Sequence, residues 1–444
     1  MSNFEFGFAQ CDITPAIGVP LCGYFNPRPN KGAFDRLAVK AAVFRTGDEV
    51  AAVVSYDLCI LDAMFLRELD AKLAAMGSPL AYKTLYCATH THTGPYSGKI
   101  FDDNADPAYM ELLEKQSLTA IMQAYASLAP AELYTAETEC TTLAFNRRYI
   151  MKDGKTATNP GKFNPDIVRP EGGIDPKIIL MEVRQFDRPA LLIANISNHT
   201  DTIGGDIVSA DWPGRMEKAI QQEVGFDLPV MTIIAPQGNI NHFNVNAPGA
   251  QTDYEEACRI GKAYAGVILS SLYQLKKQED TALVVRTGEF EAPYLQLTDE
   301  EYAEAKRIYE ENKDAVMEEG RDFTSEDIVK GVPAVKKLFA EMAIGCRENP
   351  ITEKRIERQI MIAFGKDLAI VSLPCEPFIE LGEAIRKDSK YPLTVLAGLG
   401  MGEIGYVGMK QHYGNGGYET SPSRTLADRT VGEKIVFGAL ELLK

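Results

Sequence analysis

Three apolar segments of this chain each end in a polar loop that carries histidine, and this recurring pattern constrains the fold more than any other feature. The segments cover residues 83–88, 190–196 and 230–235 and are rich in strand-forming residues. The loops that follow contain His90 and His92, then His199, then His242. Polar loops at the ends of buried strands are where α/β enzymes build their sites, so these histidines are candidates for one shared site.

The first loop holds the run Thr-His-Thr-His-Thr-Gly-Pro at residues 89–95. Side chains two positions apart on a strand share a face, so His90 and His92 should point into the same space. The Gly-Pro pair cannot continue a β-ladder and ends the strand. Two histidines bonded to neighbouring threonines could also be ordinary, satisfied polar residues. The run therefore predicts the place of a site but not its chemistry.

Strands and helices are mixed along the whole chain, which predicts an α/β fold. We expect a layered α/β sandwich with mixed sheets and with the site at strand ends. No GxGxxG follows a first strand and no GxxxxGK[ST] occurs, so dinucleotide-binding and P-loop folds are not supported. Residues 1–444 are expected to form a single catalytic domain. The stretch at about 297–345 is strongly charged and helical in pattern, and we expect it to be a helical insertion.

The net charge of -16 argues against a nucleic-acid partner, because binding of phosphates needs a basic face. No window approaches the roughly 20 apolar residues of a membrane span, and the N-terminus does not look like a leader. We therefore expect a cytoplasmic protein whose partner is a small-molecule substrate, with no prediction of its oligomeric state. The eight cysteines include no CxxC pair and are predicted to be reduced core thiols.

The polar loops offer ligands for a metal ion. They supply histidines, the carboxylate of Glu376, which follows an apolar segment ending at about residue 373, and tyrosines from the Gly-rich stretch near residues 400–418. Imidazole nitrogens together with a carboxylate oxygen are the ligand set of catalytic zinc, which keeps an open position for water. Since these loops are far apart in the chain, the pattern alone leaves open both a metal site and a set of unrelated polar clusters.

The residues of these loops resemble the neutral, non-lysosomal ceramidase family in its N-terminal catalytic domain. The similarity is most specific in the histidine run at residues 89–95 and extends over almost the whole chain. Its other parts are Asp12-Ile13-Thr14-Pro15, Gly23-Tyr24, Asn198-His199-Thr200, Ser209-Ala210-Asp211, Gly238-Asn239-Ile240-Asn241, Cys375-Glu376-Pro377, Gly405-Tyr406-Val407 and Tyr418-Glu419.

This resemblance implies a zinc site and a set of substrate contacts. In that family one Zn2+ ion is held by the first histidine of the run, a second histidine, a glutamate and a tyrosine. By resemblance these ligands are His90, His199, Glu376 and Tyr406. The second histidine of the run, an arginine and a downstream tyrosine contact substrate in the family. These correspond to His92, Arg147 and Tyr418, with Arg147 the loosest match.

The chain departs from the family pattern in two ways. Asn241 stands where the family has a serine, and an amide is not a nucleophile, although its NH₂ group can donate to an oxyanion. Attack would then come from metal-activated water, with His242 or His92 as proton carrier. The sequence also ends after its last expected helix, without the family's C-terminal β-domain, and shows no leader. Both features argue against bilayer sphingolipids as substrates.

The sequence thus predicts a zinc-dependent amidohydrolase that cleaves an amide-like, N-acyl bond in a small soluble substrate by means of metal-activated water. Two alternatives remain open. One is a metal-dependent isomerase or lyase that acts on a hydroxylated, sugar-like compound, which the loss of the serine favours. The other is a non-catalytic, metal-containing binding protein.

Overall fold

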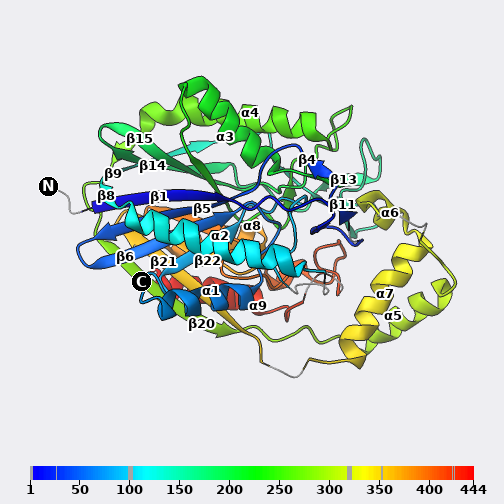
Figure 1. Ribbon diagram of the computed structural model, residues 1–444. Coiled ribbons are helices and arrows are strands. Elements are labelled where there is room, and N and C mark those ends of the chain that lie inside the picture. The colour runs from blue at the N-terminus through cyan, green and yellow to red at the C-terminus, as the bar shows by residue number, and fades with distance from the viewer. Residues whose placement is uncertain are drawn as a thin grey trace.

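Three sheets organise the chain, and each has one parallel pair of strands at an edge (Figure 1). The computed structural model describes residues 4–26, 28–98, 104–317, 323–351, 354–422, 424 and 426–444. The first sheet has the order β7 (Thr84–Ala88), β6 (Glu49–Tyr56), β5 (Ala38–Thr46), β1 (Phe4–Asp12) and β8 (Ala129–Pro130). The second has the order β17 (Val230–Ile234), β15 (Arg188–Ile196), β14 (Lys177–Gln185), β9 (Glu132–Glu139) and β19 (Lys276–Lys277). The third has the order β20 (Leu283–Glu291), β21 (Ile356–Phe364), β22 (Leu368–Leu373) and β24 (Leu393–Gly398).

The three parallel pairs are β6 with β7, β15 with β17, and β22 with β24. Their edge strands β7, β17 and β24 contact one another, so the three sheets meet along these edges. This contact covers edges that would otherwise leave backbone groups unpaired. The predicted α/β architecture with several mixed sheets is confirmed.

One buried side chain joins two of the sheets. The amide nitrogen of Asn195, on β15, donates to the carbonyl oxygens of Ile233 on β17 and Leu396 on β24, each at 2.9 Å. Its oxygen accepts from the backbone N–H of Leu396 at 3.3 Å. The oxygen also accepts from Nη2 of Arg386 on α8 (Ile379–Asp388) at 3.5 Å, and the other bonds of this buried amide fix the offset between the second and third sheets.

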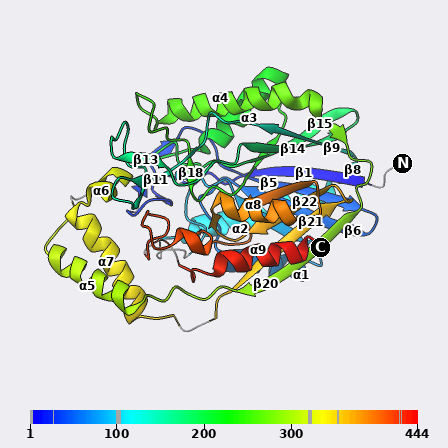
Figure 2. The ribbon, with the colours of Figure 1, turned by 180° about the vertical axis from the view of Figure 1, so that it is seen from behind.

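Helices cover the outer faces of the sheets (Figures 1 and 2). The first sheet is covered by α2 (Pro107–Ala126), with α1 (Ala63–Ala75) beside it. The second is covered by α3 (Asp211–Val224) and α4 (Tyr254–Ser271), and the third by α8 (Ile379–Asp388) and α9 (Val431–Leu442). Helix α2 begins where its pattern predicts, because Pro107 suits the first turn and Asp106 accepts from the Tyr109 backbone N–H at 2.8 Å.

Short strands and turns connect these layers and form part of the site. They are β2 (Pro20–Leu21), β3 (Arg28–Pro29), β4 (Gly32–Ala33), β10 (Phe145–Asn146), β11 (Arg148–Met151), β12 (Thr156–Thr158), β13 (Ile167–Pro170), β16 (Ile207–Val208), β18 (Ile240–Asn241), β23 (Glu376–Pro377), β25 (Tyr406–Val407) and the 3₁₀ turns Leu272–Gln274 and Lys410–His412.

A helical lobe, made of α5 (Asp299–Asn312), α6 (Ser325–Lys330) and α7 (Pro333–Glu348), projects from the end of the molecule opposite the N-terminus (Figures 1 and 2). It contains a small apolar cluster of its own, formed by Leu295, Leu297, Ala305 and Ala343. The segment predicted to be an inserted excursion at about 297–345 coincides with this lobe. That it is an insertion into a single domain stays a prediction.

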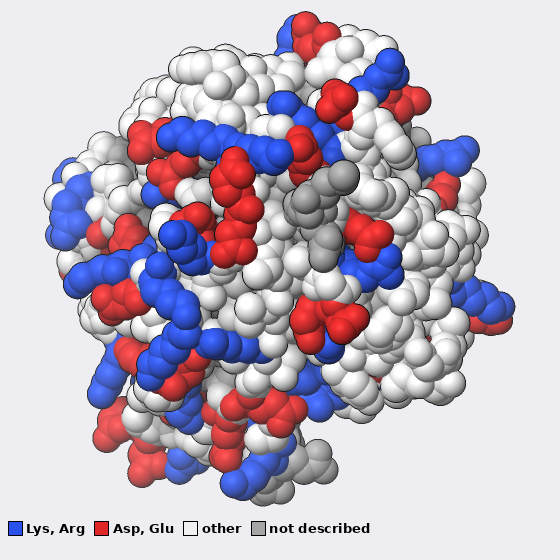
Figure 3. Space-filling view, turned by 90° about the vertical axis from the view of Figure 1, so that its left-hand side faces the viewer, with Lys and Arg blue, Asp and Glu red and all other residues white. Residues whose placement is uncertain are grey.

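The helices and one face of the surface can be compared with what a membrane or a nucleic-acid partner would require. Among the helices in the described part of the chain, none combines the length and the apolar character that a membrane crossing requires. On the face shown in Figure 3, lysine and arginine side chains alternate with aspartate and glutamate. This face therefore lacks the continuous basic stripe that a nucleic-acid backbone would need.

Candidate metal site

His90 lies just beyond β7 in a backbone conformation that is uncommon for a residue with a side chain. Its φ angle is 68°, and its N–H donates to the Leu58 carbonyl oxygen at 2.8 Å. The preceding N–H, of Thr89, donates to Tyr56 at 2.8 Å. Left-handed backbone at a non-glycine residue persists where the surroundings hold it, often at a functional site. The two hydrogen bonds to the end of β6 hold it here.

The ring of His90 presents an unprotonated nitrogen to the site when it is neutral. Its Nδ1 lies 2.7 Å from the carbonyl oxygen of Cys59, which can only accept, so Nδ1 carries the proton. Its Nε2 then holds a lone pair, and it lies 3.0 Å from Nε2 of His199 and 3.1 Å from Oε2 of Glu376. A proton on His199 Nε2 would make these contacts hydrogen bonds, and without that proton the electron-rich atoms would need a cation among them.

His199 and Glu376 come from the other two sheets. His199 follows β15, and its carbonyl oxygen accepts from Nε1 of the buried Trp212 at 2.9 Å. Glu376 follows β22 in the short strand β23, and its Oε2 lies 3.7 Å from His199 Nε2. The ligand atoms of His90, His199 and Glu376 all lie within 4.8 Å of one another, and all three residues are buried. The ends of three strands therefore converge on one point.

Tyr406 is brought beside this group by backbone pairing. Strand β25 pairs in parallel with β23, with Tyr406 opposite Glu376. Tyr406 is buried and lines the same cavity as His90 and Glu376. Three of the four expected ligands, His90, Glu376 and Tyr406, thus line the cavity, and the ligand atom of the fourth, His199, clusters with those of His90 and Glu376.

The electrostatics favour a neutral His199 and an ionised Glu376. Burial, followed by the charges of Arg147 and His90, lowers the pKa of His199 well below its usual range. Burial acts to raise the pKa of Glu376, but His90 and Arg147 outweigh it and the pKa is lowered. Burial and the Glu376 charge raise the pKa of Tyr406 well above its usual value. A neutral imidazole and an ionised carboxylate are the forms that bind metals.

His92 lies next to the ligand cluster, with an acid behind it. Its Nε2 lies 3.3 Å from His90 Nε2, and its Nδ1 lies 3.6 Å from Oδ1 of Asp201. Asp201 also accepts from the Tyr24 hydroxyl at 2.6 Å. Burial, followed by His90, lowers the pKa of His92 well below its usual range. The sequence interpretation missed the roles of Asp201 and Tyr24, although a carboxylate two positions after His199 was an available signal.

Cys59 supplies a second group of potential ligand atoms, together with His90 and His92. Its Sγ lies 3.8 Å from His90 Nδ1. That nitrogen is the one already bonded to the Cys59 carbonyl, and a hydrogen bond with Cys22, followed by burial, raises the pKa of the Cys59 thiol well above its usual value. Since a thiol binds metal as a thiolate, the set of His90, His199 and Glu376 is the better one.

Arg147 supports the site from behind. Its Nη2 donates to the Gly238 carbonyl oxygen at 2.7 Å, and its Nε lies 2.7 Å from Oε1 of Glu419. Its Cζ lies 5.1 Å from the centre of the Tyr406 ring. Arg147 is not among the described residues that line the cavity. The structure thus places it against Tyr406, and its predicted contact with substrate stays a prediction.

The remaining expected residues divide into two groups. Tyr418 lines the cavity, with its ring 5.8 Å from that of Tyr406. Asn241 and His242 are not among its described lining residues. The Asn241 amide donates to Asn159 Oδ1 and accepts from the Phe243 N–H, both at 3.0 Å, and His242 Nε2 lies 2.6 Å from the Gln251 carbonyl oxygen. These hydrogen bonds commit both side chains to the local loop, and their catalytic roles stay predictions.

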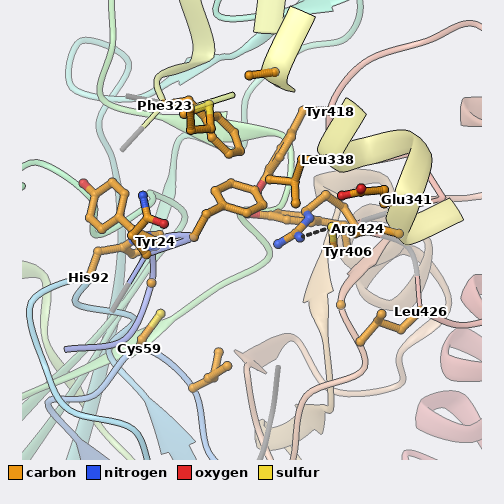
Figure 4. A pocket seen from close by; sticks show the side chains of 18 of the residues that line it. Tyr24, Cys59, His92, Phe323, Leu338, Glu341, Tyr406, Tyr418, Arg424 and Leu426 are labelled. Carbon is orange, nitrogen blue, oxygen red and sulfur yellow. Dashed lines mark hydrogen bonds between the residues drawn. The ribbon is translucent and has the colours of Figure 1, made fainter. Parts of the chain in front are cut away.

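The cavity at this site has a volume of about 670 Å³ and two kinds of lining (Figure 4). One side is polar and contains His90, His92, Glu376 and Tyr406. The rest of the lining, called here the apolar wall, comes largely from the N-terminal segment, the helical lobe and the C-terminal segment. Its members include Phe25, Val316, Phe323, Leu338, Met342 and Leu426, with Lys337, Glu341 and Arg424 among them. A mostly apolar pocket with a few convergent polar groups is typical of a small-molecule site.

Comparison with solved structures identifies the fold. The neutral ceramidase from Pseudomonas aeruginosa superposes with a TM-score of 0.74 at 16% sequence identity, covering 100% of this chain and 74% of that one. A structure described as a ceramidase complexed with C2 gives a TM-score of 0.73 at 18% identity, covering 100% and 75%. The chain has a neutral ceramidase-like fold, as the sequence resemblance predicted. No protein-family model and no curated protein sequence matches the chain.

Proposed function

We propose that this protein is a zinc-dependent hydrolase that cleaves an amide-like, N-acyl bond. The observation that carries the proposal is the convergence of His90, His199 and Glu376, whose ligand atoms lie within 4.8 Å of one another in a buried site. The similarity of the fold to ceramidases supports the choice of an amide bond. The likeness is one of fold, so the reaction is a proposal about this chain.

The chemistry of the donor set fits zinc. Two imidazole nitrogens and one carboxylate oxygen form the cluster, the Tyr406 phenol lies on the strand paired with Glu376, and nitrogen with oxygen donors suits this ion. The hydrogen bond from His90 Nδ1 to the Cys59 carbonyl is the outer contact that typically orients a ligating histidine. When bound, zinc supplies a Lewis acid for the substrate carbonyl and brings the pKa of water to about 7.

The surrounding residues supply binding and proton transfer. His92 Nε2 faces the cluster and Asp201 lies behind its Nδ1, so His92 can accept a proton at Nε2 and pass it to the leaving amine. Tyr418 lines the cavity beside Tyr406 and can hold the substrate. Arg147 holds Tyr406 in place. A water nucleophile is consistent with Asn241, which stands at the family's serine position and bonds to Asn159.

The wall of the cavity supports an acyl group as part of the substrate. Phe25, Leu338 and Leu426 line the cavity together with the polar groups. Burying an aliphatic chain against such side chains contributes roughly 25 cal/mol for each Å² of apolar surface removed from water. The substrate is therefore an N-acyl compound, with its acyl part on the apolar wall and its amide at the histidines.

Metal analysis together with His199→Ala tests the proposal. We expect the purified protein to retain about one zinc ion per chain in elemental analysis, and the variant to lose it. Retention of full zinc occupancy by the variant would remove the basis for the assignment. Incubation with N-acyl compounds should release a free amine, whereas turnover of sugar acids without amine release would point to an isomerase or lyase.

A further inference from the structure

We propose that Glu419 is a positioning residue, which holds Arg147 behind Tyr406 and holds Tyr418 beside it. The inference rests on the proposed zinc-dependent hydrolase and adds a residue that acts through others. Glu419 is fully buried. It is not among the described residues that line the cavity, whereas Tyr406 and Tyr418 both are (Figure 4). Its influence on the site is therefore expected to pass through the side chains that it contacts.

One oxygen of Glu419 faces Arg147. Its Oε1 lies 2.7 Å from Arg147 Nε, and both side chains are buried. On its other side Arg147 donates through Nη2 to the Gly238 carbonyl oxygen at 2.7 Å. A guanidinium group is planar and rigid, so contacts at two of its nitrogens fix its plane. Arg147 Cζ then lies 5.1 Å from the centre of the Tyr406 ring, which is how Glu419 reaches a proposed metal ligand.

The other oxygen of Glu419 is connected to Tyr418. Its Oε2 accepts from the Thr158 hydroxyl on β12 at 2.7 Å. The same hydroxyl oxygen accepts from the backbone N–H of Tyr418 at 3.0 Å. The Tyr418 ring lies 5.8 Å from that of Tyr406. One carboxylate thus determines the place of two side chains that flank Tyr406.

The contacts of Glu419 depend on its charge. Its Oε2 also accepts from Arg148 Nη1 at 2.8 Å. Burial acts to raise the pKa of Glu419, but Arg147 and Arg148 outweigh it and the pKa is lowered. Removing the charge of one partner leaves the other partners of a buried ion pair uncompensated. Glu419→Gln keeps the shape of the side chain and removes its charge, so it should release Arg147 from its present position.

Glu171 makes equivalent contacts on the other side of Arg148 and provides a matched comparison. Its Oε1 accepts from Arg148 Nη2 at 3.1 Å. It also accepts from the hydroxyl of Thr156 at 2.9 Å, and Thr156 precedes Thr158 by two positions on β12. Both carboxylates therefore bind Arg148 and a buried threonine of the same strand. Of the two, Glu419 is the one whose contacts extend to the proposed site.

Zinc affinity tests the connection through Arg147. In Glu419→Gln one of the two oxygens becomes an NH₂ group, which cannot accept from an arginine. We expect Tyr406 to lose its support, and zinc affinity, measured by competition with a chromophoric chelator, to fall about 10- to 100-fold, as for other partners that orient a metal ligand. Glu171→Gln should keep the wild-type affinity. A merely structural role predicts equal losses, because both carboxylates bind Arg148.

Substrate binding tests the connection through Tyr418. Thr158→Val removes the hydroxyl that lies between Glu419 and the Tyr418 peptide and leaves the ion pairs of Glu419 in place. We expect KM for N-lauroylethanolamine, or its Kd if it is not hydrolysed, to rise about 5-fold, as for the loss of one hydrogen bond. Zinc affinity should stay unchanged. Thr156→Val, which removes the hydroxyl bonded to Glu171, should leave both quantities unchanged.

The outcomes separate this inference from the proposed reaction. Equal zinc affinities in Glu419→Gln and Glu171→Gln would overturn the positioning role, even if amides are hydrolysed. If Glu419→Gln does not fold, equal KM or Kd values in Thr158→Val and Thr156→Val would overturn it. Weaker zinc binding confined to Glu419→Gln, in a protein that releases no amine, would support the positioning role and count against the hydrolase. A protein that binds no zinc would overturn both.

Discussion

The polar side of the cavity and its apolar wall are built in different ways. His90, His199 and Glu376 follow strands of three different sheets, are buried, and are held by hydrogen bonds and strand pairing. The wall comes largely from the helical lobe and the C-terminal segment, where Leu338, Met342 and Arg424 are half-buried. Aromatic contacts such as Phe25 with Phe323, at 4.1 Å between ring centres, join the lobe to the rest of the molecule.

This difference suggests that the polar side determines metal binding and that the apolar wall determines substrate choice. Ligands on strand ends are fixed by the backbone register of the sheets, so the geometry that a metal needs is determined by the fold. A wall made of helix side chains can change without disturbing that register. We therefore expect substitutions on the polar side to affect metal binding and folding, and substitutions in the wall to affect substrate choice.

The largest expected effect comes from removing a proposed ligand. Glu376→Ala leaves two imidazole nitrogens and the Tyr406 phenol, and we expect metal affinity to fall more than about 100-fold, beyond what loss of an outer hydrogen-bond partner costs. Affinity can be measured by competition with a chromophoric chelator. Glu383→Ala on α8 is the control, because that glutamate is exposed and should leave affinity unchanged. Equal affinities in the two variants would contradict the proposed ligand set.

The second-largest effect is expected from a substitution at the junction of the second and third sheets. Asn195→Ala removes the bonds to Ile233 and Leu396 and leaves buried carbonyl oxygens without a donor, which costs about 2 kcal/mol of unfolding free energy. Urea denaturation followed by circular dichroism measures the loss, with the exposed Asn246→Ala expected to stay within about 0.5 kcal/mol of the wild type. If Asn195→Ala matches that control, the contact between β17 and β24 does not depend on this amide.

The sequence predicted the polar side of the cavity better than the wall. His90, His199, Glu376 and Tyr406 could be proposed as ligands because each stands in a short motif that resembles one of the ceramidase family. Asn241 and His242 also follow an apolar segment, but Asn241 bonds to Asn159 and His242 bonds to Gln251, and their catalytic roles stay predictions. Spacing along a strand identifies which loop a side chain belongs to, but not whether a neighbouring amide or carbonyl competes for it.

The apolar wall could not be predicted from the sequence, for a different reason. The lobe could be recognised as charged and helical from its composition, but nothing in the pattern shows that α7 faces the histidines. Arg424 lies in a segment without periodicity, and its place in the wall depends on contacts with Phe25 and Met342, which are distant in the chain. Such tertiary contacts carry no local signal.

A substitution in the wall should change substrate choice and leave the metal in place. Leu338→Ala removes apolar surface from the cavity, and we expect KM for a long-chain N-acyl substrate to rise about 10-fold, with little change for an N-acetyl substrate. Leu440→Ala is the matched control, since Leu440 is also a half-buried helical leucine but lies on α9 and packs against the core of the third sheet, away from the cavity lining. Loss of zinc in Leu338→Ala would show that the two sides are not independent.

The smallest expected effect is the change of the unfolding free energy with pH, and it depends only on the polar side of the cavity. Burial and neighbouring charges lower the pKa of His199 well below its usual value of about 6.5 in the folded protein. As pH falls, His199 therefore takes up a proton in the unfolded chain before it does so in the folded protein. Its contribution to the free energy of unfolding is present above about pH 6.5 and is lost progressively below that pH. In metal-free protein at about pH 5.5 this loss approaches roughly 1.4 kcal/mol.

His199→Asn should lose less stability than the wild type over this range in urea denaturation. Leu338→Ala should keep the wild-type pH dependence, and a wild-type slope in His199→Asn would mean that another group is responsible.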